Sequence, residues 1–438
     1  MTESNEKDQV ESAEGKLAVL IPGMGAVATT FIAGVEAIRK DVTPAVGSVS
    51  QQGTLQVDGQ KKRLTEVVDL SGLDDLEFGG WDIYEGNCYD AAKEAAVLSP
   101  EHLDAVKPLL ESISPMEAVF DQEYVRNLSG PNVKKDEGKQ ALVKALRDDI
   151  RGFMESRGCE RGVAIWCGST EKFISPGEVH QSLEAFEQGL KDDHPAISPS
   201  LMYAYACLKE GIPYANGAPN LTTDCPALVE LAEREGVAIA GKDFKTGQTL
   251  IKTILAPGFS ARYLGVSGWY STNILGNRDG KVLDDPGSFK TKEESKLSVL
   301  ESILDADAHP ALYEEMAHKV RIDYYPPRGD NKEGWDNIDI FGWMGYPMQI
   351  KVNFLCRDSI LAAPLVLDLA LFLDLAQRGG DQGVQDWLSF FFKSPQAEEG
   401  QFAVHDLFDQ QRELAQRLAQ FGGVECAPTE PSSQPSLG

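Results

Sequence analysis

The sequence predicts an α/β protein in which a parallel sheet is interrupted by an inserted α+β segment. From Lys16 onward, short apolar runs alternate with helical segments, a rhythm typical of parallel strands with helices packed on both faces. Between about residues 250 and 354 the pattern changes to strand-like stretches. After Asp358 the pattern is helical again, so we expect the chain to return to the first domain.

The parallel domain is assigned from apolar runs and the helices next to them. The runs lie at residues 17–21, 163–166 and 237–240, with helices at 26–38 and 226–235. The inserted segment is assigned from three strand-like stretches separated by one helix, at residues 261–266, 320–325 and 348–354. The polar ends, residues 1–15 and 424–438, are expected to be disordered.

Composition limits the possible partners. The 438 residues are 42% hydrophobic and 25% charged, which is ordinary for a globular protein of two or more domains. There are 41 Lys and Arg against 68 Asp and Glu, a net charge of -27. This field repels nucleic acid and anionic membranes, so neither is an expected partner. It also makes a local cluster of lysines notable as an anion site.

Other features point to a cytoplasmic protein without a metal centre. The seven cysteines never show a C-x-x-C spacing and are expected to be reduced, and the six histidines form no ligand cluster. Residues 1–15 lack the pattern of a signal peptide. The apolar stretch 360–376 contains Asp368 and Asp374, so we expect a buried helix with Pro364 in its first turn.

A glycine-rich turn follows the first apolar run. Gly23-Met-Gly25-Ala-Val-Ala28 reads G-x-G-x-x-A between a strand and a helix, which is typical of a Rossmann dinucleotide-binding unit. Gly23 would make the turn, and Gly25 would let the backbone approach a pyrophosphate. A tight turn without a ligand is the alternative. No acidic strand end appears about 20 residues on, so Asp82 is the best candidate for a ribose ligand.

Two polar segments are candidates for binding a phosphorylated sugar. Residues 241–249 lead into a helix start at 246–249, where backbone N–H groups and hydroxyls would hold a phosphate and Asp243 would orient a lysine. Residues 271–280 form a predicted polar loop whose amides and carboxylate would bind sugar hydroxyls. A loop with an N-cap threonine and a simple turn are the respective alternatives.

Two lysines one helical turn apart form the third candidate. Thr291 and Glu294 match a capping box, which predicts Thr291 as the N-cap of a helix. Lys292 and Lys296 would then oppose the helix dipole unless an anion lies between them. The alternative is a solvated Lys/Glu face.

Three motifs in this order resemble the myo-inositol phosphate synthase family. They are Gly-x-Asp-Phe-Lys-Thr-Gly-Gln-Thr at 241–249, Asn-x-Leu-Gly-Asn-x-Asp-Gly at 273–280 and Phe-x-x-Lys-x-x-x-Lys at 289–296. The likeness extends over most of the chain, through residues 23–28, 80–82, 166–171, 216–220, 329–332, 358–364 and 387–395. It is closest to the compact prokaryotic form of the family.

The resemblance implies conversion of D-glucose 6-phosphate to 1L-myo-inositol 1-phosphate with tightly held NAD, the first step of inositol biosynthesis. The inositol would feed phospholipid biosynthesis or serve as an osmolyte. The implied steps are oxidation at C5, enolisation, aldol closure from C6 to C1, and reduction of the ring ketone. A homotetramer is also implied, and a monovalent or divalent cation is a further possible requirement. The alternatives are a non-catalytic NAD- or sugar-phosphate-binding homologue and a sugar-phosphate dehydrogenase.

The resemblance also assigns residues and domains. The implied catalytic residues are Lys292, Lys332, Lys393 and Asp243. The implied substrate-binding residues are Lys296, Thr246, Gly247, Gln248, Thr249, Asn273, Leu275, Asn277 and Asp279. The implied cofactor-binding residues are Gly23, Gly25, Ala26, Val27, Asp82, Ser169, Thr170, Gly217, Asp243, Asp330, Asp358 and Ser359. The Rossmann-like NAD-binding domain is expected at 16–248 and 359–423, with an inserted α+β catalytic and oligomerisation domain at 249–358.

Three residues depart from the family pattern. Lys242 replaces an acidic residue, Leu250 replaces a lysine, and Arg278 replaces an asparagine. The nucleotide loop is also poorer in Gly and Asn than in eukaryotic members. These departures concern individual contacts more than the reaction.

Overall fold

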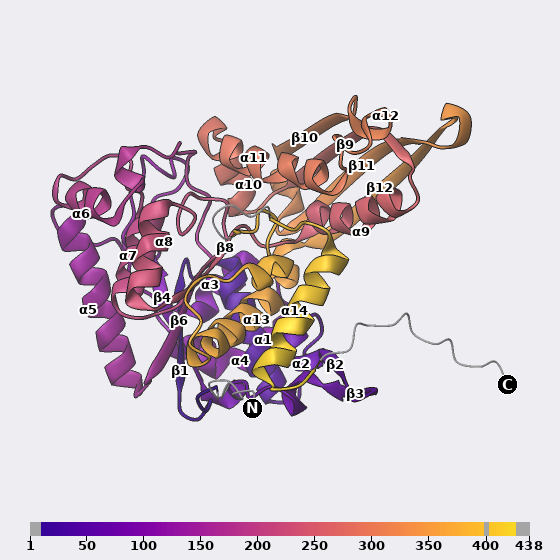
Figure 1. The fold of residues 1–438 in the computed structure, drawn as a ribbon. Coiled ribbons are helices and arrows are strands. Elements are labelled where there is room, and N and C mark those ends of the chain that lie inside the picture. Colours follow the sequence, from indigo (N-terminus) through magenta and orange to yellow (C-terminus); the bar gives the residue numbers. More distant parts are fainter. Residues whose placement is uncertain (1–9, 398–402, 426–438) are drawn as a thin grey trace.

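Seven parallel strands form the larger sheet in the computed structural model, which describes residues 10–397 and 403–425 (Figure 1). Their order is β13-β8-β7-β6-β1-β4-β5. The bounds are β1 Leu17–Pro22, β4 Leu76–Asp82, β5 Met116–Glu117, β6 Arg161–Trp166, β7 Tyr214–Asn216, β8 Ala238–Gly241 and β13 Gly383–Val384. The prediction of an α/β fold with a parallel sheet is confirmed.

Both faces of this sheet are covered, because alternate residues of its strands enter two different cores. Val19 and Ile21 pack in one core, whereas Leu20 packs in the other, and all six residues of β1 are buried. One core is shared with α1 (Ala26–Arg39), α3 (Cys88–Ala95), α4 (Pro100–Ser112), α13 (Asp358–Arg378) and α14 (Leu407–Phe421). The other is shared with α5 (Lys139–Arg157), α6 (Leu183–Lys191), α7 (Pro199–Lys209) and α8 (Pro226–Glu235).

The strand order explains why the ribose candidate lies so far along the sequence. β4 pairs directly with β1, and its Trp81 is in register with Pro22. Between them the chain forms α2 (Val49–Gln52) and a hairpin of β2 (Thr54–Val57) and β3 (Gln60–Arg63) outside the parallel sheet. Asp82 therefore ends the strand beside the glycine turn, although many residues separate the two in sequence.

Helix α13 is the apolar stretch that the sequence predicts as a buried helix. It is long and apolar enough to cross a membrane, but 78% of its apolar window is buried, so it is a core helix. The helix begins at Asp358, so the prediction that Pro364 lies in the first turn is wrong. Asp358 and Ser359 supply the first turn instead, and Pro364 lies inside the helix.

The inserted segment forms a four-stranded sheet with the order β10-β9-β11-β12. Strands β9 (Gly265–Leu275) and β10 (Ala317–Tyr324) are parallel, while β11 (Asn331–Phe341) is antiparallel to both β9 and β12 (Pro347–Arg357). Its buried face packs on α9 (Gly247–Ala261) and α11 (Pro286–Ile303), through residues such as Phe259, Leu300 and Ile338. Shorter helices are α10 (Arg278–Leu283) and α12 (Pro310–Tyr313). The α+β prediction for this segment is confirmed.

Two details of the insert differ from prediction. The expected strand at 261–266 is mostly the end of α9 and a turn, because the apolar run that begins at Leu250 continues the helix to Ala261. The stretches are separated by α10, α11 and α12 rather than by one helix. Short 3-10 helices complete the described chain: η1 Leu64–Glu66, η2 Leu73–Asp75, η3 Glu178–His180, η4 Pro326–Arg328, η5 Trp343–Gly345 and η6 Asp386–Phe391.

Helix α11 begins earlier than the sequence predicts. Its N-cap is Asp285, whose carboxylate accepts hydrogen bonds from the N–H groups of Gly287 and Ser288 at 2.9 and 3.2 Å. The prediction of Thr291 as the N-cap is therefore wrong. An Asp followed by Pro286 at the first helical position is the stronger start signal. Thr291 lies inside the helix, and its hydroxyl donates to the carbonyl of Glu171 at 3.0 Å.

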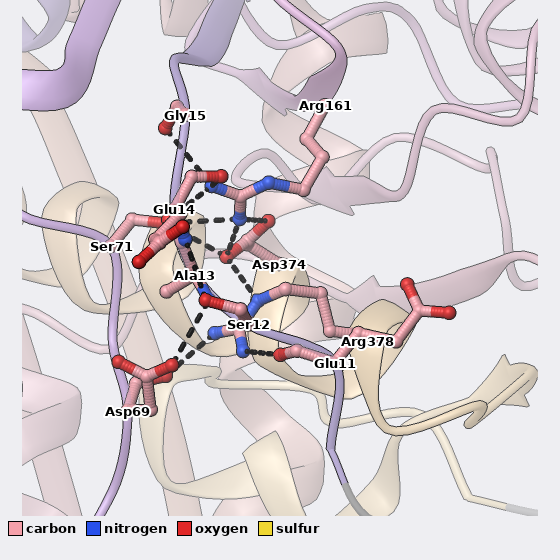
Figure 2. Close-up of polar contacts among 10 residues, drawn as sticks. All are labelled: Glu11, Ser12, Ala13, Glu14, Gly15, Asp69, Ser71, Arg161, Asp374 and Arg378. Carbon is pink, nitrogen blue, oxygen red and sulfur yellow. Dashed lines mark hydrogen bonds and ion pairs between the residues drawn. The ribbon is translucent and has the colours of Figure 1, made fainter.

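The residues just before β1 are held against the parallel sheet by two arginines (Figure 2). Arg161 donates to the three carbonyls of residues 13–15 at 2.6 to 3.3 Å, and Arg378 donates to the carbonyl of Glu11 at 2.7 Å. Both guanidinium groups also contact the carboxylate of Asp374, whose side chain is 3% exposed. We call this group of residues the arginine clamp.

The arginine clamp changes the expected extent of the N-terminal tail. The sequence predicts disorder for residues 1–15, but Glu11 and residues 13–15 are hydrogen-bonded to the folded chain. Arginines far along the sequence donate these bonds, so the local sequence of the N-terminal segment does not predict that it is ordered. Residues 1–9 and 426–438, which hold most of the two predicted tails, lie outside the described residues.

Candidate active site

A cavity of about 570 Å³ lies at the carboxyl ends of the parallel strands, where the inserted segment meets them. This edge is where open parallel sheets bind ligands. All twelve predicted cofactor residues lie on its wall: Gly23, Gly25, Ala26, Val27, Asp82, Ser169, Thr170, Gly217, Asp243, Asp330, Asp358 and Ser359. Thr246, Asn277, Asp279 and Lys393 lie there as well. The structure thus brings together residues from across the chain, while their individual roles stay predictions.

The glycine turn and the start of α1 fit a dinucleotide phosphate. A Cβ at Gly23 would lie 2.3 Å from the Cα of Gly168, so only glycine permits this packing of the turn. A Cβ at Gly25 would meet nothing within 4 Å, which leaves room in front of the backbone. The N-terminus of α1 has no side-chain cap and no acidic residue in its first turn. Its partial positive charge is available to an anion such as the pyrophosphate of NAD.

Asp82 lies at the end of β4, on the same cavity wall as the glycine turn. Its carboxylate accepts a hydrogen bond from the N–H of Tyr84 at 3.1 Å. Burial raises the pKa of Asp82, and this hydrogen bond opposes the shift. A carboxylate here is well placed to accept hydrogen bonds from ribose hydroxyls, as in other parallel dinucleotide folds.

A buried ion pair between a lysine and an aspartate also lines the cavity. The Nζ atom of Lys393 lies 3.1 Å from Oδ1 of Asp243, and the two side chains are 4% and 2% exposed. The backbone N–H of Lys393 also donates to the carbonyl of Asp243 at 2.7 Å. Asp243 has a φ of 64°, a left-handed conformation that is uncommon outside glycine. The loop that presents this carboxylate is therefore tightly constrained.

A second ion pair, between a buried lysine and a partly exposed aspartate, lies at the junction of β11 and α13. The Nζ atom of Lys332 is 2.5 Å from Oδ2 of Asp358. Burial opposes the charged form of Lys332, but the carboxylates of Asp358 and Asp279 outweigh burial and raise the pKa of this lysine. Lys332 therefore carries a fixed positive charge at neutral pH.

The start of α9 follows the first ion pair along the chain. Thr246, its N-cap residue, makes no side-chain capping bond, and no acidic residue lies in the first turn. A Cβ at Gly247 would lie 3.4 Å from Oδ1 of Asp358, so this turn adjoins the second ion pair. Gly247, Gln248 and Thr249 are buried, whereas the sequence predicts exposed backbone groups. A buried, uncapped helix start is suited to an anion.

Residues 271–280 are not the polar loop that the sequence predicts. Residues up to Leu275 complete β9, because their side chains alternate between the two faces of the sheet, and Asn277 caps α10. The Asn277 amide also donates to Asp330 at 3.1 Å, and burial raises the pKa of Asp330. Asn273 is 1% exposed, and its amide has no hydrogen-bond partner among the described residues. An unpaired buried amide of this kind is a sign of a polar ligand in the insert.

Lys292 and Lys296 lie on α11, in its second and third turns rather than at its start. Their side chains lie outside the described residues, so the anion site predicted between them is untested. Among the described residues, no group of three or more His, Cys, Asp or Glu side chains is arranged to hold a metal ion. The six cysteines of this part of the chain are unpaired.

Comparisons with known proteins agree with this geometry. The family model described as myo-inositol-1-phosphate synthase, an NAD-binding family, matches residues 17–418. The chain belongs to this family. It is 53% identical to inositol-3-phosphate synthase 1 of Bacteroides thetaiotaomicron over 94% of this chain and 97% of that protein. It is 33% identical to inositol-3-phosphate synthase 1 of Oryza sativa over 83% of this chain and 75% of that protein.

A solved structure extends the comparison. The crystal structure of inositol-3-phosphate synthase from Caenorhabditis elegans matches with a TM-score of 0.88 and 26% identity, over 97% of this chain and 90% of that chain. The resemblance inferred from the motifs is therefore confirmed. The NAD-binding family model also supports NAD as the cofactor.

Two of the departures from the family pattern form ion pairs. Arg278 lies over the ring of Tyr84, 4.0 Å from its centroid, and pairs with Glu94, so it links the insert to the parallel domain beside the cavity. Lys242 pairs with Asp224 at 2.6 Å. Sequence reasoning noted both residues but missed these contacts, because nothing local connects residues so far apart in the chain.

Proposed function

We propose that this protein is an isomerase that converts D-glucose 6-phosphate to 1L-myo-inositol 1-phosphate with catalytic NAD. The observation that carries the proposal is a pair of buried lysines, each ion-paired with an aspartate on the wall of the cavity that the dinucleotide turn and an uncapped helix start also line. A module that only binds NAD or a sugar phosphate needs the turn and the helix start. It has no use for buried ammonium groups, which stabilise charge that develops during a reaction.

The parallel domain would hold the cofactor. The α1 N-terminus would bind the pyrophosphate, and Asp82 would bind a ribose. The walls formed by residues 167–170 and 358–359 would enclose the rest of the molecule. NAD, when bound, accepts hydride from C5 of the sugar and later returns it.

The lysines would control charge on the sugar oxygens. Oxidation, enolisation and ring closure each develop negative charge on an oxygen, which an ammonium group in a water-poor site stabilises strongly. Lys332 is held positive by its neighbours, so we assign it to electrostatic stabilisation of the enolate or aldol oxygen, together with Lys393. Lys292 would move the proton of the C5 hydroxyl, with Asp243 as its orienting carboxylate.

The start of α9 would bind the phosphate group. Backbone N–H groups of residues 246–249 and the ammonium of Lys296 are the proposed contacts. Asn273, Leu275, Asn277 and Asp279 would contact the sugar, and the unpaired Asn273 amide supports this placement. A requirement for a monovalent or divalent cation stays a prediction.

The insert also supports a homotetramer. The face of its sheet opposite α9 carries Tyr270 and Leu355, which are 42% and 59% exposed, and the β11–β12 turn carries Trp343, which is 89% exposed. Exposed apolar groups of this extent are typical of an interface between subunits. The free cysteines support a reducing, cytoplasmic location.

One assay separates this function from a dehydrogenase. Purified protein is given glucose 6-phosphate and substoichiometric NAD, and inositol phosphate and NADH absorbance are followed together. The expected result is many turnovers with no net NADH. Accumulation of one NADH for each substrate consumed would support a sugar-phosphate dehydrogenase instead, and binding without any product would support a sensor.

The two lysines of α11 test the assignment of roles. Lys292→Ala is expected to abolish turnover with little loss of substrate affinity, because its interaction strengthens in the transition state. Lys296→Ala is expected to weaken binding of substrate and inorganic phosphate about 10- to 150-fold, the loss of one charge-assisted hydrogen bond. Wild-type rate and affinity in both variants would mean a solvated helix face.

Light scattering tests the assembly. Leu355→Arg places a charge on the open sheet face and is expected to reduce the tetramer to smaller species at micromolar concentration. Val46→Arg is the matched control, since Val46 is 79% exposed on the parallel domain. A wild-type protein that is monomeric at this concentration would contradict the homotetramer.

A further inference from the structure

The buried face of the inserted sheet contains a carboxylate that the proposed mechanism does not use. Asp336 lies on β11 and is 2% exposed. Its Oδ1 accepts hydrogen bonds from the indole N–H of Trp269 at 2.9 Å and from the hydroxyl of Ser271 at 2.5 Å. Its Oδ2 accepts from the side-chain amide of Gln248 at 3.0 Å. Asp336 thus connects two strands to the first turn of α9.

The amide nitrogen of Gln248 is committed to this sheet. Besides Asp336, it lies 3.2 Å from the carbonyls of Thr272 and Trp335, which are directly paired in β9 and β11. An amide nitrogen carries two hydrogens, so these three acceptors account for both. The side-chain nitrogen of Gln248 is therefore not available to a phosphate. In the proposed phosphate site, this residue can donate only through its backbone N–H.

The packing around Gln248 leaves it little freedom to turn toward the cavity. A Cβ at Gly334 would lie 2.9 Å from the Gln248 side chain, so the glycine makes room for the amide. Lys252, one turn further along α9 and 2% exposed, lies 2.7 Å from Nε2 of His318 and near the Asp336 carboxylate. The helix is thus anchored to the sheet at two successive turns.

We propose that Asp336 is a positioning residue for phosphate binding, acting through the side chain of Gln248. The pair fixes the direction of the first turn of α9, so that its backbone N–H groups converge on the phosphate. The inference rests on the proposed function only for the identity of the substrate. Misplacing donors by a fraction of an ångström weakens binding without removing any direct contact.

The test uses the full-length, NAD-loaded protein and inorganic phosphate as the probe, with binding measured by calorimetry. Asp336→Asn keeps an acceptor for Trp269 but sets an NH₂ group against the NH₂ group of Gln248. The dissociation constant for phosphate is expected to rise about 10-fold. The affinity for NAD is expected to stay within twofold. Asp339→Asn is the matched control, because this carboxylate lies on the same strand but on the opposite face of the sheet.

A double-mutant cycle identifies the route of the effect. If Asp336 acts through Gln248, then Asp336→Asn combined with Gln248→Leu should bind phosphate no more weakly than the worse single variant. Additive losses, or a fall in melting temperature with unchanged phosphate affinity, would overturn the proposal. Ser271→Ala removes one donor to Asp336 and is expected to cause a smaller loss in the same direction, which keeps the test valid if Asp336→Asn fails to fold.

The outcome is separable from that of the proposed reaction. A protein that forms no inositol phosphate, but whose phosphate affinity depends on Asp336 and Gln248 as described, would contradict the function and leave the positioning role in place. Normal product formation with phosphate affinity indifferent to Asp336 would contradict only the positioning role.

Discussion

The parallel sheet and the inserted sheet contribute to the cavity in different ways. The parallel sheet is covered on both faces, and it offers backbone groups for an anion, a glycine turn and an uncapped helix N-terminus, together with the Asp82 carboxylate at the end of β4. The inserted sheet is covered by helices on one face, and it brings charged and amide side chains such as Lys332 and Asn273. A rigid two-sided core is suited to holding a cofactor in place. A one-sided sheet leaves side chains on one face for chemistry and keeps the other face free for the proposed homotetramer contact.

Among the variants that compare the two regions, the largest expected loss of activity comes from removing a charged side chain of the cavity wall. Lys393→Ala deletes an ammonium group that is 4% exposed and paired with Asp243. Turnover is expected to fall about 100- to 1000-fold, the typical cost of losing one group that stabilises transition-state charge. Single-turnover kinetics measure the rate of the chemical steps, and NAD titration measures the affinity for the cofactor. Lys191→Ala, on the surface of α6, is the control. If Lys393→Ala lost as much NAD affinity as turnover, the separation of cofactor binding from chemistry would be contradicted.

The next effect concerns the rigidity of the parallel domain. Arg378→Gln removes one of two arginines from Asp374 and from the carbonyl of Glu11. Breaking a buried charge pair in this way is expected to lower the free energy of unfolding by about 3–5 kcal/mol. Urea unfolding gives the value. Arg63→Gln removes an ion pair whose side chains are 72% and 48% exposed, and it should change stability by less than about 1 kcal/mol. If the two variants lost the same free energy of unfolding, the arginine clamp would stabilise the protein no more than an exposed ion pair does.

A variant of the parallel sheet tests whether NAD binding can be weakened without changing phosphate binding. Asp82→Asn removes the charge at the end of β4 and is expected to weaken NAD binding about 10- to 100-fold, since a hydrogen bond to a charged group is lost. Phosphate affinity should stay unchanged, because the carboxylate belongs to the parallel sheet. Calorimetry with each ligand provides the check, and Asp74→Asn, on an exposed surface, is the control.

The smallest expected effect is a pH dependence that originates in the insert. Burial lowers the pKa of Lys252 to about 8, and the Asp336 carboxylate opposes the shift. A lysine in the unfolded chain has a pKa near 10.4, so above pH 8 the unfolded state binds more protons than the folded state. Stability should therefore rise with pH, by about 1.5 kcal/mol between pH 8 and 9.5 from this group. Lys252→Met should remove that rise. Unfolding curves of the wild type and of Lys252→Met between pH 8 and 9.5 measure this difference. If stability rose equally with pH in both proteins, Lys252 would not be the source of the rise.

The sequence predicts the parallel domain better than the insert, and the reason is physical. Apolar runs such as residues 17–21 report burial on both faces of a strand, and the glycine turn fixes its own local geometry. Helix starts are less certain, because several residues compete to cap them. Asp285 with Pro286 outranks the Thr291 capping box, and Asp358 starts α13 before Pro364.

The site shows the same limit. Motifs identify residues of the right chemistry, and the cavity wall contains most of them. Motifs do not show which way each side chain points. The Gln248 side chain points into the sheet, Asn273 lies in a strand rather than a loop, and Arg278 lies over Tyr84. Each depends on contacts between residues that are distant in sequence, which spacing alone does not specify.

Helix α13 has a consequence for how the protein is made. It packs on α1 and β6 in the core of the parallel domain, yet it follows the whole insert in the chain. During translation, β1 and β6 leave the ribosome long before the helix that covers them, so the nascent chain exposes an apolar sheet face until residue 378 is available. The arginine clamp has the same dependence on late residues, because the carbonyl of Glu11 accepts its hydrogen bond from Arg378, which is synthesised much later (Figure 2). Nascent chains stalled at residue 357 should therefore be far more sensitive to protease than chains stalled after residue 425 has emerged, and equal sensitivity would show that the parallel domain folds without its last helices.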